Sequence, residues 1–176
     1  MDNQSIPQIQ TVGVIGCGLM GSGIVEVCAR AGFQVVVSEV SQEALHAGLG
    51  RLRQSLDKGL ARGKLGQAEH AEALDRVRGT TDFEDFAACD LVIEAVLENL
   101  DAKHQVFRRL DEICPWHCIL ASNTSSISIT KIAAATDRPD KVIGAHFFNP
   151  VPVMPLLEIV RGLQTTDSTY QALRAF

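Results

Sequence analysis

The sequence predicts an α/β fold: a doubly wound, mostly parallel sheet with a helical insertion after the second strand and an antiparallel hairpin near the C-terminal end. Short apolar runs of strand length alternate with helical patterns along the chain. The first of these runs breaks into glycines at the spacing G-x-G-x-x-G. With 176 residues, 46% hydrophobic and 21% charged, the chain has the size and composition of one globular domain.

The glycines of this motif, Gly16, Gly18 and Gly21, lie between a predicted strand, 9–15, and a predicted helix that ends near Arg30. In a Rossmann unit the first glycine permits a tight turn, and the second lets the backbone approach a pyrophosphate. The third lets the helix pack closely on the strand, while the positive end of the helix faces the phosphates. A glycine-rich turn that holds no ligand is the alternative.

An acidic residue, Glu39, follows the second apolar run, 33–37, and lies eighteen residues after Gly21. At the end of the second strand of a Rossmann unit, such a residue binds the adenosine ribose hydroxyls. Its negative charge would also repel a 2′-phosphate. We therefore predict that Glu39 contacts the cofactor and that the cofactor is NAD rather than NADP. A solvated carboxylate at a strand end is the alternative.

The charge balance argues against several classes of partner. Sixteen basic and twenty-one acidic residues give a net charge of −5, without a basic cluster, so we expect neither nucleic acid nor an anionic membrane as a partner. The first ten residues, M-D-N-Q-S-I-P-Q-I-Q, do not resemble a signal peptide, and no apolar run approaches the length of a membrane span. These features predict a cytoplasmic protein that acts on small molecules.

The cysteines also favour a reducing compartment. They are Cys17, Cys28, Cys89, Cys114 and Cys118. Their number is odd and most lie within apolar patterns, as buried free thiols do. Cys114, His117 and Cys118 are close together, but the chain has no second ligand pair at metal spacing, so we predict no metal site.

The helical insertion begins at Ser41, which is predicted to cap a long amphipathic helix. Its core stripe comprises Ala44, Leu45, Leu49, Leu52, Leu56 and Leu60. Its opposite face carries Arg51, Arg53, Lys58, Arg62 and Lys64. A second, shorter helix is predicted over 67–74. The basic face is either simply solvated or contacts a ligand that bears phosphates.

Past the insertion, the pattern predicts a short strand at 76–79 and a capping box that starts at Thr81. The clearest buried strand, L-V-I-E-A-V, covers 91–96 and leads to Glu98 and Lys103. Because ligands bind at the carboxyl ends of parallel strands, these two side chains are expected beside the cofactor. The alternative is an ordinary surface pair of Glu and Lys.

The next helix is predicted to end at Pro115, and a strand at 118–121 leads into the loop 122–126, S-N-T-S-S. This loop leaves the carboxyl end of its strand and offers hydroxyl and amide groups to a ligand. It is equally consistent with a plain loop that caps a helix at 127–135.

A histidine and a glutamate lie symmetrically about the proline-rich loop 149–155. His146 lies three residues before this loop and Glu158 three residues after it, each in a predicted strand. In an antiparallel hairpin of even register the two side chains would be directly opposite, with Cβ atoms about 4.5–5.5 Å apart. A carboxylate beside an imidazole fixes its tautomer and raises its basicity, which suits a dehydrogenase base better than a core histidine.

Taken together, these residues resemble the NAD-binding domain of the 3-hydroxyacyl-CoA dehydrogenases, a β-oxidation family that includes 3-hydroxybutyryl-CoA dehydrogenase. The resemblance runs from Gln10 to about Asp167. It is carried by G-C-G-L-M-G-S-G-I, D-L-V-I-E-A-V-x-E-N, S-N-T-S-S-I, H-F-F-N-P-V-P-V-M and E-I-V-R-G-L. It implies oxidation of a (3S)-3-hydroxyacyl-CoA to the 3-oxoacyl-CoA, or the reverse, with NAD as cofactor.

The resemblance also implies roles for individual residues. His146 would be the general base, Glu158 its partner, and Ser125 a hydrogen-bond donor to the reacting oxygen. The residues expected at the cofactor are Gly16, Gly18, Leu19, Met20, Gly21, Glu39, Glu98, Lys103, Asn123, Ser125 and Asn149. Those expected at the acyl-CoA substrate are Ser55, Arg62, Lys103 and Ser125. The sequence departs from the family with Arg at 62 for Lys, Glu at 39 for Asp, and Pro at 155 for Lys.

Members of this family continue as an all-helical domain that closes the acyl pocket, forms a homodimer and supplies an asparagine to the site. We therefore expect residues 1–176 to be a truncated NAD-binding domain that binds NAD, turns over poorly by itself and self-associates through the surface left uncovered. The alternative is a binding module without activity, such as a crystallin-like relative. The pairing of His146 with Glu158 favours the enzyme, because a binding module needs no base.

Overall fold

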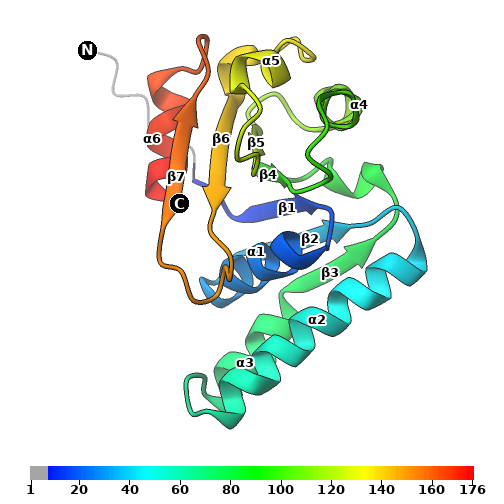
Figure 1. Cartoon of the computed structure of the whole chain (residues 1–176), viewed down its shortest axis with the longest axis vertical. Coiled ribbons are helices and arrows are strands. Elements are labelled where there is room, and N and C mark those ends of the chain that lie inside the picture. Colours follow the sequence, from blue (N-terminus) through cyan, green and yellow to red (C-terminus); the bar gives the residue numbers. More distant parts are fainter. Residues whose placement is uncertain (1–7) are drawn as a thin grey trace.

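A twisted seven-stranded sheet with helices on both faces forms the centre of the molecule (Figure 1). The computed structural model describes residues 8–176. The strands are β1 (Thr11–Ile15), β2 (Gln34–Ser38), β3 (Val77–Thr80), β4 (Leu91–Glu94), β5 (Ile119–Ser122), β6 (Val142–Phe147) and β7 (Leu157–Arg161). The helices are α1 (Leu19–Arg30), α2 (Gln42–Ala61), α3 (Gln67–Asp75), η1 (Phe83–Phe86), α4 (Leu100–Ile113), α5 (Ile129–Ala133), η2 (Pro139–Lys141) and α6 (Asp167–Ala175).

The strand order, β3-β2-β1-β4-β5-β6-β7, confirms the predicted fold class. Strands β1 to β6 are parallel, and only β7 runs antiparallel to its neighbour, β6. The direction of chain progression reverses between β1 and β4, so their carboxyl ends open a crevice at the switch point of the sheet. The glycine motif follows β1 at this crevice.

Two apolar clusters explain why helices cover both faces. On one face α1, α2, α3 and α6 pack on the sheet through side chains such as Ile24, Leu52 and Leu173. On the other face η1, α4 and α5 pack through Phe86, Phe107 and Ile132. Because both faces are buried, β4 carries the continuous apolar run that the sequence shows rather than an alternating pattern.

The predicted insertion is the α2–α3 pair, which projects from the sheet at the bottom of Figure 1. Ser41 caps α2 as predicted, since its hydroxyl accepts a hydrogen bond from the Ala44 N–H at 3.2 Å. Leu45, Leu52 and Leu56 of the leucine stripe are buried against the rest of the domain. The inner face of α2 therefore stabilises the fold, and its basic side chains remain available to a ligand.

The capping box predicted at Thr81 is wrong. Asp82 is the N-cap residue of η1 instead, because its side chain accepts from the Glu84 N–H at 3.0 Å. The preceding strand continues through Thr80, whose hydroxyl accepts from the Asp82 N–H at 2.9 Å, and this moves the start of η1 along the chain.

Two predicted elements are shorter than expected. The helix expected at 127–135 is α5, Ile129–Ala133, with Ser128 as its N-cap residue, and the turn before it is held by the Thr124 hydroxyl, which accepts from the Ile127 N–H at 2.9 Å. The strand expected at 91–96 ends at Glu94, whose carboxylate accepts from the Val96 N–H at 2.7 Å. The five cysteines are free and buried, as predicted. Within the described residues, we find no helix with the length and apolarity of a membrane span.

Candidate active site

The glycine loop between β1 and α1 has the three features expected of a dinucleotide-binding turn. Gly16 has φ of +90°, and a Cβ there would lie 2.8 Å from the Ala95 carbonyl oxygen. A Cβ on Gly21 would lie 1.8 Å from the Gly16 carbonyl oxygen, so helix and loop pack too closely for any other residue. A Cβ on Gly18 would have no neighbour within 4 Å, which leaves an open approach to the backbone.

The N-terminus of α1 is suited to a phosphate group. Gly18 is its N-cap residue and provides no side-chain hydrogen bond, and the first turn carries no acidic residue. The unpaired N–H groups and the positive end of the helix dipole therefore meet no competing anion from α1 itself. The loop and the helix together fit the pyrophosphate of a dinucleotide.

Glu39 lies immediately after β2 and contacts the same loop. Its Oε1 accepts from the Cys17 N–H at 2.6 Å, and its Oε2 accepts from the Val40 N–H at 3.2 Å. The carboxylate is half-buried and keeps further lone pairs for ribose hydroxyls. Burial, and then the charge of Glu39, raise the pKa of the Cys17 thiol to about 11, so this cysteine is not a nucleophile at neutral pH.

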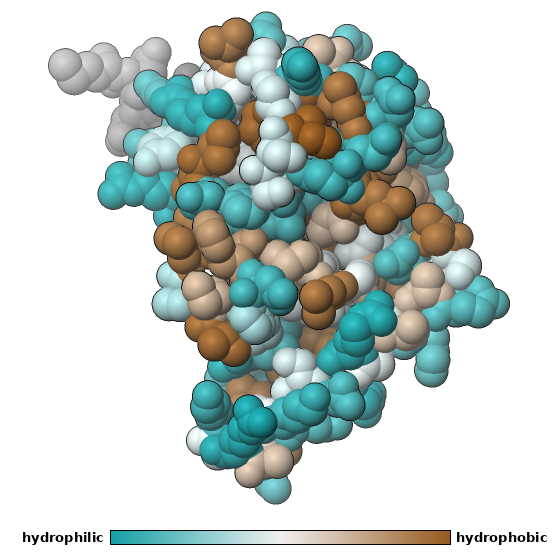
Figure 2. All heavy atoms as spheres, in the orientation of Figure 1, coloured by the Kyte–Doolittle hydropathy of each residue, from teal (hydrophilic) through white to brown (hydrophobic). Residues whose placement is uncertain are grey.

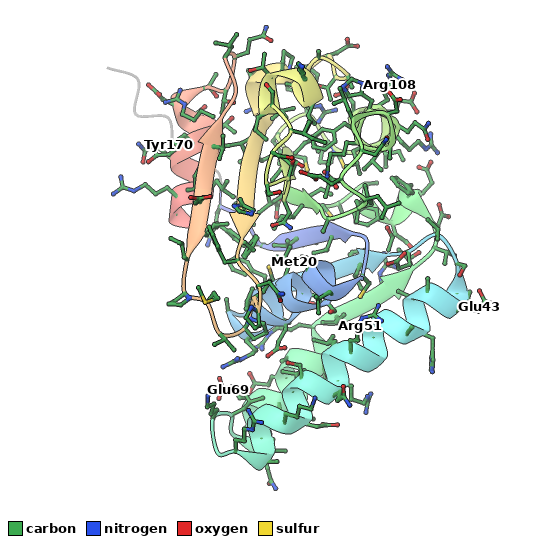
Figure 3. All side chains as sticks on the ribbon, in the orientation of Figure 1. Met20, Glu43, Arg51, Glu69, Arg108 and Tyr170 are labelled. Atoms are coloured by element: carbon green, nitrogen blue, oxygen red, sulfur yellow. The ribbon has the colours of Figure 1, made fainter. Side chains whose placement is uncertain are left out.

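The sequence placed Arg51 on the basic face of α2, and in the structure its guanidinium reaches the glycine loop. Its Nη2 donates to the Cys17 carbonyl oxygen at 2.8 Å. In Figure 3 Arg51 on α2 and Met20 at the start of α1 lie on the same face of the molecule. The helical period of the sequence shows which face of α2 Arg51 occupies. The contact with Cys17 depends on how α2 packs against α1, which the sequence of α2 alone does not predict.

Glu98 holds the serine-rich loop after β5 in place. Its Oε1 accepts from the Thr124 hydroxyl at 2.5 Å and from the Ser125 N–H at 3.1 Å. It also accepts from the Ser126 N–H at 3.2 Å. Burial alone would raise the pKa of Glu98, but the Thr124 hydrogen bond and the nearby Lys103 ammonium outweigh it and hold this pKa at about 2.

Lys103 is buried, so the alternative of a surface Glu and Lys pair is wrong for this residue. Its side chain is 1% exposed, and its Nζ lies 2.7 Å from Glu94 Oε1 and 3.2 Å from Glu98 Oε2. Glu94 was not singled out from the sequence. It lies within an apolar strand. An acidic residue in such a strand indicates a buried ion pair, because a buried carboxylate requires a partner.

His146 and Glu158 face each other across the β6–β7 ladder, which confirms the register predicted from the proline-rich loop. The imidazole Nδ1 lies 2.8 Å from Glu158 Oε2. With Nδ1–H donated to the carboxylate, Nε2 is left as the acceptor. The neighbouring Asn123 fixes this end of β6, since its Oδ1 accepts from the Phe147 N–H at 2.8 Å.

These side chains converge on one cavity of about 330 Å³, which we call the catalytic pocket. It is lined by Met20, Ala95, Val96, Glu98, Lys103, Asn123, Ser125, His146, Phe147, Phe148 and Asn149. Seven residues predicted from the sequence thus meet at one place: Met20, Glu98, Lys103, Asn123, Ser125, His146 and Asn149. They come from four separate segments of the chain: Met20, 98–103, 123–125 and 146–149.

A second cavity of about 290 Å³, which we call the α2 pocket, shares Asn149 with the catalytic pocket. Leu19, Ser55 and the basic residues Arg51 and Lys58 also line it. The structure therefore brings Ser55 toward the site. Arg62 lies at the C-terminal end of α2, is exposed and does not line this cavity, so its contact with a substrate remains a prediction.

Comparison with known proteins agrees with this geometry. Residues 11–176 match the family described as 3-hydroxyacyl-CoA dehydrogenase, NAD binding domain, which confirms the prediction of NAD. The chain is 48% identical over 162 residues to a probable 3-hydroxybutyryl-CoA dehydrogenase of Bacillus subtilis, and the match covers 92% of this chain and 56% of that protein. It is 51% identical over 157 residues to a probable 3-hydroxybutyryl-CoA dehydrogenase of Deinococcus radiodurans, with 89% and 56% covered.

A solved structure is equally similar. The crystal structure of (S)-3-hydroxybutyryl-CoA dehydrogenase from Ralstonia eutropha superposes with a TM-score of 0.93 at 49% identity, covering 96% of this chain and 59% of that one. The chain therefore spans little more than half the length of these relatives. On its sequence, its fold and its site, the chain belongs to the NAD-binding domain family of the 3-hydroxyacyl-CoA dehydrogenases.

Proposed function

We propose that this chain is the cofactor-binding part of an NAD-dependent dehydrogenase that oxidises a (3S)-3-hydroxyacyl-CoA to the 3-oxoacyl-CoA, or catalyses the reverse reduction. The observation that carries the proposal is the pairing of His146 with Glu158 on the wall of a pocket that Ser125 also lines. The names of the relatives, probable 3-hydroxybutyryl-CoA dehydrogenases, support the substrate class. Fatty-acid or related acyl-CoA metabolism is the corresponding setting.

In this proposal each residue of the catalytic pocket has a chemical task. His146 accepts the proton of the 3-hydroxyl group at Nε2, because Nδ1 is engaged by Glu158 at 2.8 Å. Glu158 then stabilises the imidazolium that forms. Ser125 donates a hydrogen bond to the same substrate oxygen. Bound NAD supplies the acceptor for the hydride that leaves C3, and the pocket residues hold the substrate carbon in position for it.

The α2 pocket is the proposed subsite for the coenzyme A part of the substrate. Ser55 offers a hydroxyl there, and Arg51 and Lys58 offer positive charge to phosphate groups. Asn149 lies between the two pockets, so an acyl chain in one and a pantetheine arm in the other would be continuous. Arg62 would add a further cation at the end of α2.

The test is turnover of acetoacetyl-CoA with NADH, followed by loss of NADH absorbance, for this chain and for a longer form that carries the second domain. We expect turnover by the longer form and tight NADH binding with little turnover by the chain alone. Binding without turnover in both forms would overturn the proposal. It would favour the second candidate, a non-catalytic dinucleotide-binding module. The 53% exposure of the Glu158 side chain supports this candidate.

Three further expectations belong to this proposal. From the family resemblance we expect that the whole protein contains an all-helical second domain and forms a homodimer. It acts in the cytoplasm, where the five buried free thiols stay reduced. The chain by itself self-associates through exposed apolar residues at and around β7, which Figure 2 colours brown. A clean monomer in light scattering at high concentration would contradict the last expectation.

A further inference from the structure

Glu94 is a fully buried carboxylate at the carboxyl end of β4, beside the switch point of the sheet. It accepts hydrogen bonds from the Lys103 ammonium at 2.7 Å and the Ser122 hydroxyl at 2.6 Å. It also accepts from the Val96 N–H at 2.7 Å. Because all three partners are donors, the contacts are those of an ionised acid rather than a protonated one.

The group around Lys103 carries more negative than positive charge. Its ammonium lies between two carboxylates, Glu94 at 2.7 Å and Glu98 at 3.2 Å. Two carboxylates and one ammonium leave an excess of one negative charge in this cluster. Glu98, whose side chain is 40% exposed, would be enough to neutralise the lysine, so the fully buried Glu94 adds a burial cost that ion pairing does not require.

This charge lies behind the catalytic pocket. Lys103 and Glu98 both line it, and Glu94, which does not line it, contacts the Lys103 ammonium at 2.7 Å. Apart from His146, no other lining residue of this pocket has a titratable side chain. Buried charges act over several ångströms with less screening than charges in water, so the excess reaches whatever group occupies the pocket.

We propose that Glu94 sets the relative affinity of the site for the oxidised and the reduced cofactor, by supplying the excess negative charge of the Glu94–Lys103–Glu98 cluster. This inference rests on the proposed function: because the hydride is transferred in the catalytic pocket, the nicotinamide end of NAD would bind there. The nicotinamide ring is a cation in NAD⁺ and neutral in NADH, while the remainder of the cofactor is unchanged. A fixed anion behind the ring therefore strengthens NAD⁺ binding selectively and lowers the reduction potential of the bound cofactor.

The experiment compares two dissociation constants in this chain, one for NADH from fluorescence titration and one for NAD⁺ from displacement of NADH. Glu94→Gln keeps the size of the side chain and removes the excess charge. We expect NAD⁺ to weaken about tenfold relative to NADH, the scale of one partly screened charge at several ångströms. A purely structural role would weaken both cofactors together and leave their ratio unchanged.

Two further variants separate charge from packing. Lys103→Met raises the excess to two negative charges, so the ratio should move in the opposite direction, toward NAD⁺. The double variant Glu94→Gln/Lys103→Met restores an excess of one, so its ratio should return to within about twofold of the unaltered chain, although both affinities fall. Asp101→Asn removes an exposed carboxylate from the same helix and serves as the matched control, with less than about a twofold effect.

The outcomes distinguish this inference from the proposed function. If the unaltered chain bound neither cofactor, the proposed function would fail and the inference with it. If both cofactors bound and Glu94→Gln left their ratio unchanged, only the inference would be overturned. Should Glu94→Gln not fold, Lys103→Met and the double variant test the inference instead. If the ratio of the NAD⁺ and NADH dissociation constants were the same in these two variants, a role for the charge would be contradicted.

Discussion

His146 on β6 and Glu158 on β7 are directly opposed in the antiparallel ladder, and the imidazole Nδ1 lies 2.8 Å from the carboxylate Oε2. The pairing fixes the tautomer of the imidazole and leaves Nε2 free to take a proton. Both residues stand on strands rather than on loops, so their geometry is set by the backbone hydrogen bonds of the sheet.

Replacing His146 with alanine should remove most of the turnover and leave cofactor binding nearly intact. A general base contributes about 10²–10⁴-fold to the rate, and this imidazole is not part of the glycine loop that holds the phosphates. Steady-state rates with acetoacetyl-CoA in the longer form, together with NADH titration, measure the two effects. A variant that lost NADH affinity in proportion to its rate would show that His146 acts mainly in binding or folding.

Replacing Glu158 with glutamine should lower kcat about tenfold or more, because the imidazolium formed during oxidation loses its counter-charge. Steady-state rates in the longer form provide the measurement, and an NADH titration shows whether cofactor binding is intact. If the rate stayed as it was, another group would have to orient His146.

The chain should bind NADH more tightly than NADPH, because the Glu39 carboxylate would face the 2′-phosphate of NADPH. Glu39→Ala should narrow this preference by about tenfold or more. Arg51, whose Nη2 donates to the Cys17 carbonyl oxygen at 2.8 Å, would then offer a positive charge beside the same loop. Parallel fluorescence titrations with the two cofactors test the prediction, and equal affinities in the unaltered chain would remove Glu39 from this role.

The glycine loop offers a matched pair of substitutions. Gly18→Ala places its methyl group in open space at φ of −68°, so the fold should keep its stability while NADH binding weakens at least about tenfold. Gly21→Ala places its methyl group 1.8 Å from the Gly16 carbonyl oxygen, so it should lower the thermal midpoint as well as binding. Thermal unfolding and NADH titration of both variants separate the two effects. Equal stability loss in both would contradict these distinct roles.

Glu98 should stabilise the fold in a way that depends on pH. Its pKa in the folded chain, about 2, lies below its ordinary value of 4.5, so its stabilisation is complete above about pH 4.5 and is lost as the pH falls toward 2. Glu98→Gln should therefore be less stable than the unaltered chain at neutral pH, by about 1 kcal/mol or less, because the side chain is 40% exposed. Urea unfolding at about pH 7, 4 and 2.5 should show the difference shrinking. A difference independent of pH would rule out the charge as its source.

Much of the molecule follows from local pattern. The spacing of Gly16, Gly18 and Gly21 specifies a turn whose backbone conformations and close contacts only glycine permits. The fold class, a doubly wound parallel sheet, follows from alternating strands and helices, because parallel crossovers have few allowed topologies. The register of His146 and Glu158 follows from a period of two residues counted outward from one loop, so it can be read directly from the sequence.

Tertiary packing determines the contacts between elements, which the periodicity of a single helix or strand does not predict. Arg51 reaches the glycine loop because of the way α2 packs against α1. The Lys103 ammonium donates to Glu94 on β4, and Ser122 on β5 donates to the same carboxylate. These contacts join residues that are distant in sequence, so they depend on how whole elements meet rather than on propensity at any one position. The sequence by itself therefore determined the fold, the cofactor and the paired base, while the packing of β4, β5 and α4 placed the buried charge behind the catalytic pocket.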